Sequence, residues 1–187
     1  MRVGRTGRPS ANAAGGCWTR SSKTSARHAA DSGRPTISVG KPCTTGVRFV
    51  DTNVLIYAAS PSAEDAEKRR RAQDLLREGG LAVSVQVLQE FYWQVTRATR
   101  ADPLSPSQAL RFIESIREFP VQDLTLAVFR AGVALSQRFR LSYWDGAILA
   151  AARACGCDAV YSEDLSDRQD YEGLRVINPF REHGRRR

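Results

Sequence analysis

Two hydrophobic periods alternate along the middle of the chain, and together they predict an α/β protein. Short apolar runs, which are typical of buried strands, occur at 47–50, 81–85, 120–124, 158–161 and 174–177. Between them, apolar residues recur at helical spacing, and the predicted helices span 54–58, 63–78, 86–100, 107–119, 125–139 and 142–155. Strands that alternate with helices indicate a mostly parallel central sheet of about five strands, flanked by helices and joined by right-handed crossovers.

Local signals support several of these boundaries. Gly79 and Gly80 are expected to end the helix at 63–78, because glycine is common just past helix C-termini. In the helix at 107–119, the apolar residues Leu110, Ile113 and Ile116 are expected to face inward.

The net charge of +8 belongs to the two ends of the chain. Residues 1–46 carry eight Lys/Arg against one acid, and residues 181–187 carry four Arg against one Glu, which leaves −2 for residues 47–180. Residues 1–46 also lack apolar periodicity, so we expect a disordered basic tail. A transit peptide and a start codon assigned too far upstream are the other interpretations of this segment. The predicted organisation is therefore a domain at 47–180 between two basic tails.

The remaining composition predicts a soluble, cytoplasmic protein. No stretch reaches the roughly 20 apolar residues of a membrane span. Cys155 and Cys157 have no second Cys/His pair that would complete a zinc site, and the histidines, His28 and His183, lie in the tails. We expect free thiols in a reducing compartment.

Four acidic residues form the candidate site. Asp51 ends the first strand, Glu90 lies early in the helix after the second, Asp145 lies in the first turn of its helix, and Asp164 follows the fourth strand. In open α/β sheets, ligands gather beyond the carboxyl ends of the strands. We therefore expect these carboxylates to converge at one edge.

Each acid also has a structural interpretation. Asp51 could cap the following helix, and Glu90 could be a solvated helix residue. Asp164 could be a turn residue, in which case the ligand from this segment would be Glu163, Asp167 or Asp170. The sequence Ser142-x-x-Asp145 resembles a capping box with Asp in place of Glu. The face of Asp145 is nevertheless apolar, and a carboxylate there must be paired, protonated or metal-bound.

A cation is expected where carboxylates converge, because without one they would repel each other and raise their own pKa values. Hard oxygen ligands suit Mg²⁺, with Mn²⁺ as a substitute. Such ions generate hydroxide and stabilise both oxygens of an in-line displacement at phosphorus, the chemistry of nucleases and some phosphatases.

Four segments resemble the motifs of PIN domains, particularly VapC-type toxins of bacterial toxin–antitoxin pairs. They are Val47 to Tyr57, Gln89-Glu90-Phe91-Tyr92, Tyr143 to Ile148, and Ser162-Glu163-Asp164-Leu165 with the closing Val176 to Phe180. Single motifs of this kind are weak, but four in the right order are specific.

The resemblance implies a three-layer PIN-like fold and a Mg²⁺-dependent endoribonuclease that is inhibited by a cognate antitoxin and often forms a homodimer. It makes Asp51 and Asp145 the principal metal ligands, with Glu90 and Asp164 completing the site. Thr52, Asn53 and Ser162 would support the substrate or the ligands. The target RNA, the number of ions and the identity of the antitoxin are not specified by the sequence.

Other interpretations stay open. A housekeeping PIN nuclease without an antitoxin would share these motifs, and so would an inactive module that binds RNA or protein. The aromatic residues Tyr92, Trp93, Tyr143 and Trp144 are expected to form an antitoxin groove or an RNA-stacking surface, with core packing the role of at least two of them.

Overall fold

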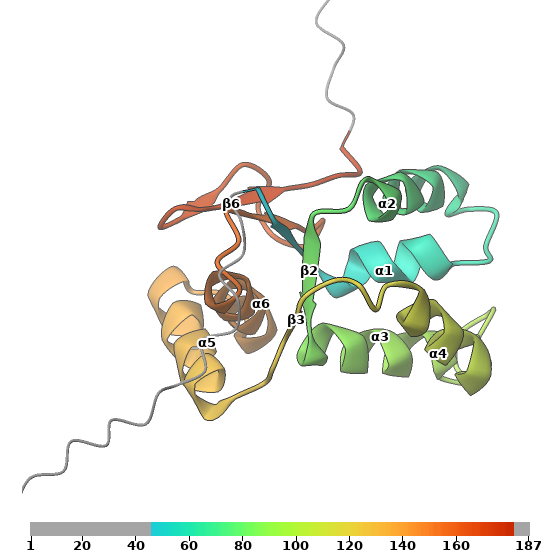
Figure 1. Cartoon of the computed structure of the whole chain (residues 1–187), viewed down its shortest axis with the longest axis horizontal. Coiled ribbons are helices and arrows are strands. Elements are labelled where there is room, and N and C mark those ends of the chain that lie inside the picture. Colours follow the sequence, from blue (N-terminus) through green and yellow to red (C-terminus); the bar gives the residue numbers. More distant parts are fainter. Residues whose placement is uncertain (1–45, 182–187) are drawn as a thin grey trace, which may run out of the picture. The chain divides into compact units, whose positions relative to one another are not determined.

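The computed structural model describes residues 46–181, in which one central sheet has helices on both faces (Figure 1). The tails at 1–45 and 182–187, with Cys17, Cys43, His28 and His183, lie outside the described residues. The helices are α1 (Thr52–Ala59), α2 (Ala66–Glu78), α3 (Val85–Thr96), α4 (Pro106–Ser115), α5 (Leu126–Phe139) and α6 (Tyr143–Ala154). The strands are β1 (Arg48–Val50), β2 (Leu81–Ser84), β3 (Val121–Gln122), β4 (Ala159–Tyr161), β5 (Asp170–Tyr171) and β6 (Leu174–Ile177).

The sheet has the order β3-β2-β1-β4-β6-β5, and the predicted parallel pairing is confirmed for its first five strands. In the three central strands, Phe49 of β1 lies beside Ala82 of β2 and Val160 of β4. These three residues are buried, as expected for a strand region covered on both faces. Only β5 runs antiparallel to its neighbour, β6.

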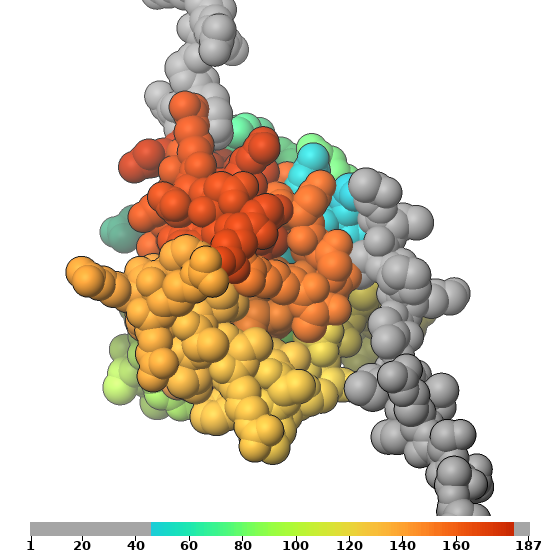
Figure 2. Space-filling model, turned by 90° about the vertical axis from the view of Figure 1, so that its left-hand side faces the viewer, coloured from blue at the N-terminus to red at the C-terminus, as the bar shows by residue number. Residues whose placement is uncertain are grey.

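The strand order explains the three layers. The chain moves outward from β1 to β2 and β3 through α1–α4, which lie on one side of the sheet in Figure 1. It then returns past β1 to β4, so a crossover of the same hand must lie on the opposite side, where α5 and α6 are found. Figure 2 views this second face, with α5 and the C-terminal strands on its surface.

Side-chain caps begin most of the helices. The hydroxyl groups of Ser84, Ser105, Thr125 and Ser142 each accept a backbone N–H from the first turn of α3, α4, α5 and α6. Ser105 and Gln108 form a complete capping box, and Pro106 occupies the first helical position. Gly79 has a φ of 74° and ends α2, as predicted.

Some predicted boundaries differ from the structure. Helix α3 ends at Thr96 rather than near Arg100, because the carbonyl of Val95 accepts the N–H of Leu104 and the chain turns back. In α4, Leu110 is 54% exposed, whereas Ala109 is buried on the inner face. Strand β5 was not predicted, since two residues are too few to show a period.

Glycine allows α5 and α6 to approach each other closely. A Cβ atom on Gly146 would lie 2.4 Å from the carbonyl oxygen of Gly132, and one on Gly132 would lie 3.0 Å from Cα of Ala147. Helix α6 in turn contacts β2, β3, β4 and β6. The first turn of α6, which carries Asp145, is therefore fixed by tight packing. Within residues 46–181, no helix is long and apolar enough to cross a membrane.

Candidate functional site

The centre of the candidate site is the point where the strand order reverses. From β1 the chain proceeds to β2 on one side, whereas β4 pairs with β1 on the other. Such switch points leave a crevice outside the carboxyl ends of the strands. Asp51 directly follows β1 and Ser162 directly follows β4, so this topology places the two side by side.

Asp51 is a buried carboxylate, 8% exposed, that is surrounded by neutral hydrogen-bond donors. Its Oδ1 accepts the backbone N–H of Thr52 at 2.6 Å, which caps α1. Its Oδ2 accepts the Ser162 hydroxyl at 2.6 Å and the Asn53 amide at 3.0 Å. The capping interpretation of Asp51 is thus correct for one oxygen, while the other oxygen faces the crevice residues.

Burial raises the pKa of Asp51 to about 7. The hydrogen bonds from Ser162 and from the Thr52 backbone lower this pKa, and the nearby carboxylates of Asp164 and Glu90 raise it further. The surroundings of Asp51 therefore disfavour its negative charge, and a positive partner would favour it.

Two residues of α1 connect Asp51 to the other acids. The amide nitrogen of Asn53 donates to Asp51 and also to Asp164 Oδ2, at 3.1 Å. The hydroxyl of Thr52 donates to Glu90 Oε2 at 2.9 Å, which ties α3 to the same place. The structure thus brings Asp51, Glu90 and Asp164 together. Thr52 binds Asp51 through its backbone N–H and Glu90 through its hydroxyl, and the Asn53 side chain binds Asp51 and Asp164. Within the described chain, the buried Oδ1 of Asn53 has no hydrogen-bond partner.

Asp145 is held by its own helix terminus. Its Oδ2 accepts the hydroxyl of Ser142 at 2.8 Å, and its backbone N–H donates to the same hydroxyl at 3.1 Å. The Asp145 carboxylate is also one cause, after burial, of the raised pKa of Tyr171. Over residues 46–181 no hydrogen bond joins this carboxylate to Asp51, Glu90 or Asp164, so in this conformation the structure groups three of the four predicted acids.

The structure also separates the acids that follow β4. Glu163 accepts the Tyr57 hydroxyl at 2.6 Å and forms an ion pair with Lys68 at 2.7 Å. Burial and this carboxylate raise the pKa of Tyr57, so its phenol stays a donor. Asp167 accepts the backbone N–H of Asn178 at 2.9 Å and fixes the C-terminal segment. Of the acids in this segment, Asp164 is the one bonded to Asn53 and near Asp51.

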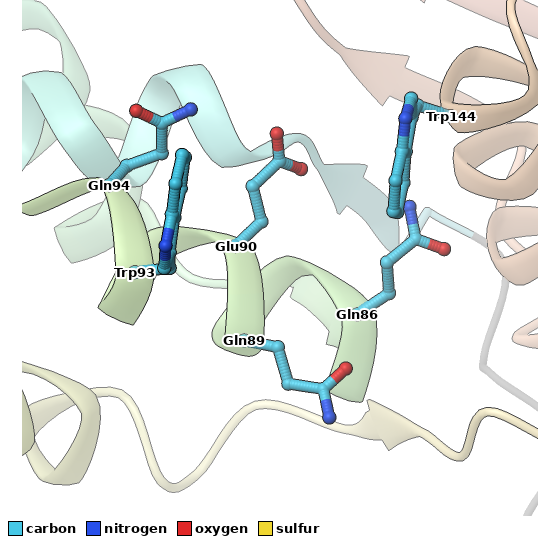
Figure 3. Close-up of a pocket in the computed structure, with 6 residues that line it drawn as sticks. All are labelled: Gln86, Gln89, Glu90, Trp93, Gln94 and Trp144. Atoms are coloured by element: carbon cyan, nitrogen blue, oxygen red, sulfur yellow. The ribbon is translucent and has the colours of Figure 1, made fainter. Parts of the chain in front are cut away.

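A pocket of about 500 Å³ adjoins the acidic residues (Figure 3). It is lined by Gln86, Gln89, Glu90, Trp93 and Gln94 of α3 and by Trp144 of α6. Figure 3 shows the Glu90 carboxylate in the space between the two indoles. Glu90 is thus shared between the pocket and the acidic residues, because Thr52 binds the same carboxylate.

A comparison with protein-family models identifies the family of this chain. The model of the PIN domain matches residues 48–168, about two thirds of the chain, and this range contains all four predicted acids.

The chain belongs to the PIN domain family.

Solved structures share the fold of this PIN domain. A chain of a toxin–antitoxin complex from Klebsiella pneumoniae is 21% identical, with a TM-score of 0.52, and the match covers 71% of this chain and 98% of that chain. DNA-bound VapBC from Salmonella typhimurium matches with the same coverage at 18% identity and a TM-score of 0.50. VapBC2 from Rickettsia felis, bound to a fragment of promoter DNA, also matches with that coverage, at 15% identity and a TM-score of 0.50. No curated protein sequence matches this chain.

The donor chemistry of this PIN domain fits a hard divalent cation. In the described part of the chain, no three His, Cys, Asp or Glu side chains are placed to hold a metal ion together. Mg²⁺ does not need such a cage, because it binds through one or two carboxylates and keeps several waters. Asp51 and Asp164, which share the amide nitrogen of Asn53, offer carboxylate oxygens at one place.

Sequence reasoning named Asn53 as support for the substrate or the ligands, but it did not specify its partners, because Asp164, to which its amide nitrogen donates, lies 111 residues away. It also did not single out Gln86, whose side chain lines the pocket at 5% exposure. A buried glutamine in the first turn of a helix leaves no distinctive sequence pattern.

Proposed function

We propose that this PIN domain is a Mg²⁺-dependent endoribonuclease and the toxin of a toxin–antitoxin pair. The observation that carries the proposal is the buried Asp51 at the switch point, surrounded by neutral donors and by Glu90 and Asp164. A protein retains a carboxylate in such surroundings when a cation or a substrate compensates its charge. The PIN match and the likeness to toxin folds support the nuclease and toxin assignments.

In the proposed reaction, the residues of this chain would have different roles around the RNA phosphate that is cut. Asp51 and Asp164 would hold the cation directly, and Glu90 would hold its water ligands. When bound, Mg²⁺ would supply an activated water and charge stabilisation for displacement at phosphorus. The Asn53 amide orients Asp51 and Asp164 toward each other, and the Ser162 hydroxyl fixes the second oxygen of Asp51.

Asp145 enters the proposal through its motif, Tyr143 to Ile148, and it also lies at the start of α6 next to Trp144 of the pocket. In the structure its carboxylate is engaged by Ser142. For Asp145 to act as a ligand, this cap must open so that the carboxylate turns toward Asp51. The cap and the ligand roles can be separated by mutation, because Ser142 and Asp145 contribute different halves of the same contact.

The test uses the full-length chain and a mixture of structured RNAs. Cleavage is expected with Mg²⁺ and with Mn²⁺, and none with EDTA. Asp145→Asn keeps the size and an acceptor oxygen but removes the charge, and we expect it to abolish cleavage. Its matched control, Ser142→Ala, removes the cap and leaves the charge, so cleavage should persist. Cleavage that survives in Asp145→Asn and fails in Ser142→Ala would make Asp145 structural.

The toxin role makes a separate prediction in cells. Expression of the chain is expected to arrest growth, and Asp51→Asn is expected to relieve the arrest. The gene of an inhibitory partner should lie beside that of the chain. A homodimer is also part of the proposal, supported by the exposed apolar side chains Val121, Leu124, Leu126 and Phe129 along one segment. Sedimentation of the purified chain measures this state directly.

A further inference from the structure

The pocket beside Glu90 has three properties that together select its ligand. It is open between two exposed indoles, since Trp93 is 59% and Trp144 is 61% exposed. The guanidinium of Arg97 covers the Trp93 ring at 5.2 Å, and Tyr143 contacts Trp144 edge to face at 5.4 Å. Both indoles are thus supported from outside the pocket lining, and both appear nearly edge-on in Figure 3. Large aromatic rings that are supported and exposed on both sides of a pocket are suited to a flat ligand.

The second property is the charge of the pocket. Of its six lining residues, Glu90 is acidic, three are glutamines, and none is Lys or Arg. A phosphate group would be repelled by Glu90 and would find no cation there. A neutral flat group with polar edges matches both the rings and the amides, and its volume is well within what a pocket of about 500 Å³ accepts.

The third property is an unsatisfied donor. The amide nitrogen of Gln86 is buried without a hydrogen-bond partner, although the residue is only 5% exposed and lines the pocket. A buried donor without a partner is costly, so a ligand that brings an acceptor gains affinity. A guanidinium group, which would otherwise suit Glu90 and two indoles, has donors only and cannot satisfy Gln86. A nucleobase has ring nitrogens or carbonyl oxygens that can.

We propose that this pocket binds one unpaired nucleobase of an RNA substrate between Trp93 and Trp144, with the amide of Gln86 donating to the base edge. The proposal rests on the proposed function in one respect: the shared Glu90 places this base next to the phosphate that is cut. It restricts the substrates to single-stranded segments, because a base inside a duplex cannot enter between two rings.

The test measures base stacking separately from cleavage. The full-length chain carrying Asp51→Asn, which keeps the RNA intact, is titrated with short single-stranded RNAs in which one adenine is replaced by 2-aminopurine. Stacking on an indole quenches 2-aminopurine fluorescence. Quenching is expected, and Trp93→Leu and Trp144→Leu should each weaken binding about tenfold. The control is Tyr92→Leu, an exposed aromatic residue of α3 outside the pocket lining, which should bind the RNA as before.

Gln86 is tested with Gln86→Met, which keeps the length of the side chain and removes the donor. We expect weaker RNA binding and thermal unfolding at the same or a higher temperature, because the substitution removes a buried donor that has no partner in the free protein. Binding that depends on neither tryptophan, or no binding of the RNA probes at all, would overturn the proposal. Displacement of the RNA by an arginine amide and not by adenosine would also overturn it, in favour of a peptide groove.

These outcomes are distinguishable from failure of the proposed function. Quenching that depends on the tryptophans, together with no cleavage by the unsubstituted chain, would leave the base site standing and remove the nuclease. Cleavage that survives in both tryptophan variants with unaltered RNA affinity would leave the nuclease and remove the base site.

Discussion

Asp51 and Asp167, two aspartates with little-exposed side chains, lie in contrasting surroundings at the same end of the sheet. Asp167, whose side chain is 6% exposed, accepts the N–H of Asn178 and lies 3.7 Å from the guanidinium of Arg168 and 3.6 Å from that of Arg181. Its charge is compensated within the chain. Asp51 is 8% exposed, but its partners are a hydroxyl, an amide and a backbone N–H, and its nearest charged neighbours are acids.

Glu163 and Asp164 repeat the contrast at adjacent positions. Glu163 is neutralised by Lys68 and also accepts from Tyr57, whereas Asp164 is bonded to the neutral amide of Asn53. A little-exposed carboxylate therefore does not by itself mark the candidate site, since the Asp167 side chain is little exposed as well. The distinguishing feature is a carboxylate that lacks a positive partner among the described residues it contacts and that lies beside other acids. Where such a group is buried, as Asp51 is, it costs stability unless a ligand compensates its charge.

The strongest test of this contrast is Asp51→Asn. The folded pKa of Asp51, about 7, lies above the ordinary 3.8, so ionising it costs more in the folded than in the unfolded chain. The resulting loss in the free energy of unfolding is absent below about pH 4 and grows between pH 4 and 7. Above about pH 7 it reaches its full size of about 4 kcal/mol. In EDTA at pH 8, the variant should be more stable than the unsubstituted chain, and the difference should vanish at pH 4. Urea unfolding at both pH values measures this.

The same substitution should reduce Mg²⁺-dependent cleavage by more than about a hundredfold, the upper end of what the loss of a group supporting a metal ligand costs. A variant that is less stable than the original at pH 8 would contradict the contrast, because Asp51 would then be as well compensated as Asp167.

The bridging role of Asn53 is tested by Asn53→Ala. This variant removes the amide that joins Asp51 to Asp164 and leaves both acids in place. The affinity for Mn²⁺ should fall about 10- to 100-fold, as expected for groups that orient metal ligands. Titration calorimetry on the full chain measures it. An unchanged affinity would show that the acids are positioned by their strands alone.

The fold could be predicted from the sequence because it depends on local patterns that are visible within a few consecutive residues. The apolar run 47–50, the glycines after α2 and the capping serines each specify an element within a few residues. The sequence also predicted that Asp51, Glu90 and Asp164 would meet, since each follows a parallel strand whose carboxyl end lies at one edge.

What could not be predicted depends on contacts between distant segments. Lys68 lies on a charged helix with several other cations, and only the folded structure selects it as the partner of Glu163. Leu110 was expected inside, but the inner face of α4 turned by one residue toward Ala109, where the smaller side chain fits. For Asp145, half of the capping box suggested by the sequence is present. The Ser142 hydroxyl accepts the Asp145 N–H, but the Asp145 carboxylate accepts from that hydroxyl and not from the Ser142 backbone.

The compensated partner of the contrast is tested by Asp167→Asn. The amide oxygen can still accept the Asn178 N–H, but the charge that faces Arg168 and Arg181 is lost. We expect the free energy of unfolding at pH 8 to fall by about 1 kcal/mol, because a charge-assisted hydrogen bond becomes a neutral one. This decrease in the free energy of unfolding is opposite to the increase expected for Asp51→Asn at the same pH. RNA cleavage should be unaffected. If Asp167→Asn instead raised the free energy of unfolding at pH 8, the distinction between the two aspartates would be lost.

The smallest expected effect comes from Lys68→Met, which leaves Glu163 with its Tyr57 donor and without its cation. The Lys68 side chain is 40% exposed, so the loss of stability should stay below about 1 kcal/mol and shrink as salt is added. Glu163 would then resemble Asp164 in lacking a positive partner, and the site as a whole would become more negative. Mn²⁺ should consequently bind slightly more tightly at low ionic strength, and this gain should disappear at high salt. A loss of Mn²⁺ binding in this variant would instead mean that the Lys68–Glu163 ion pair positions the acidic residues of the site. The acids with a cationic partner and those without one would then not be independent.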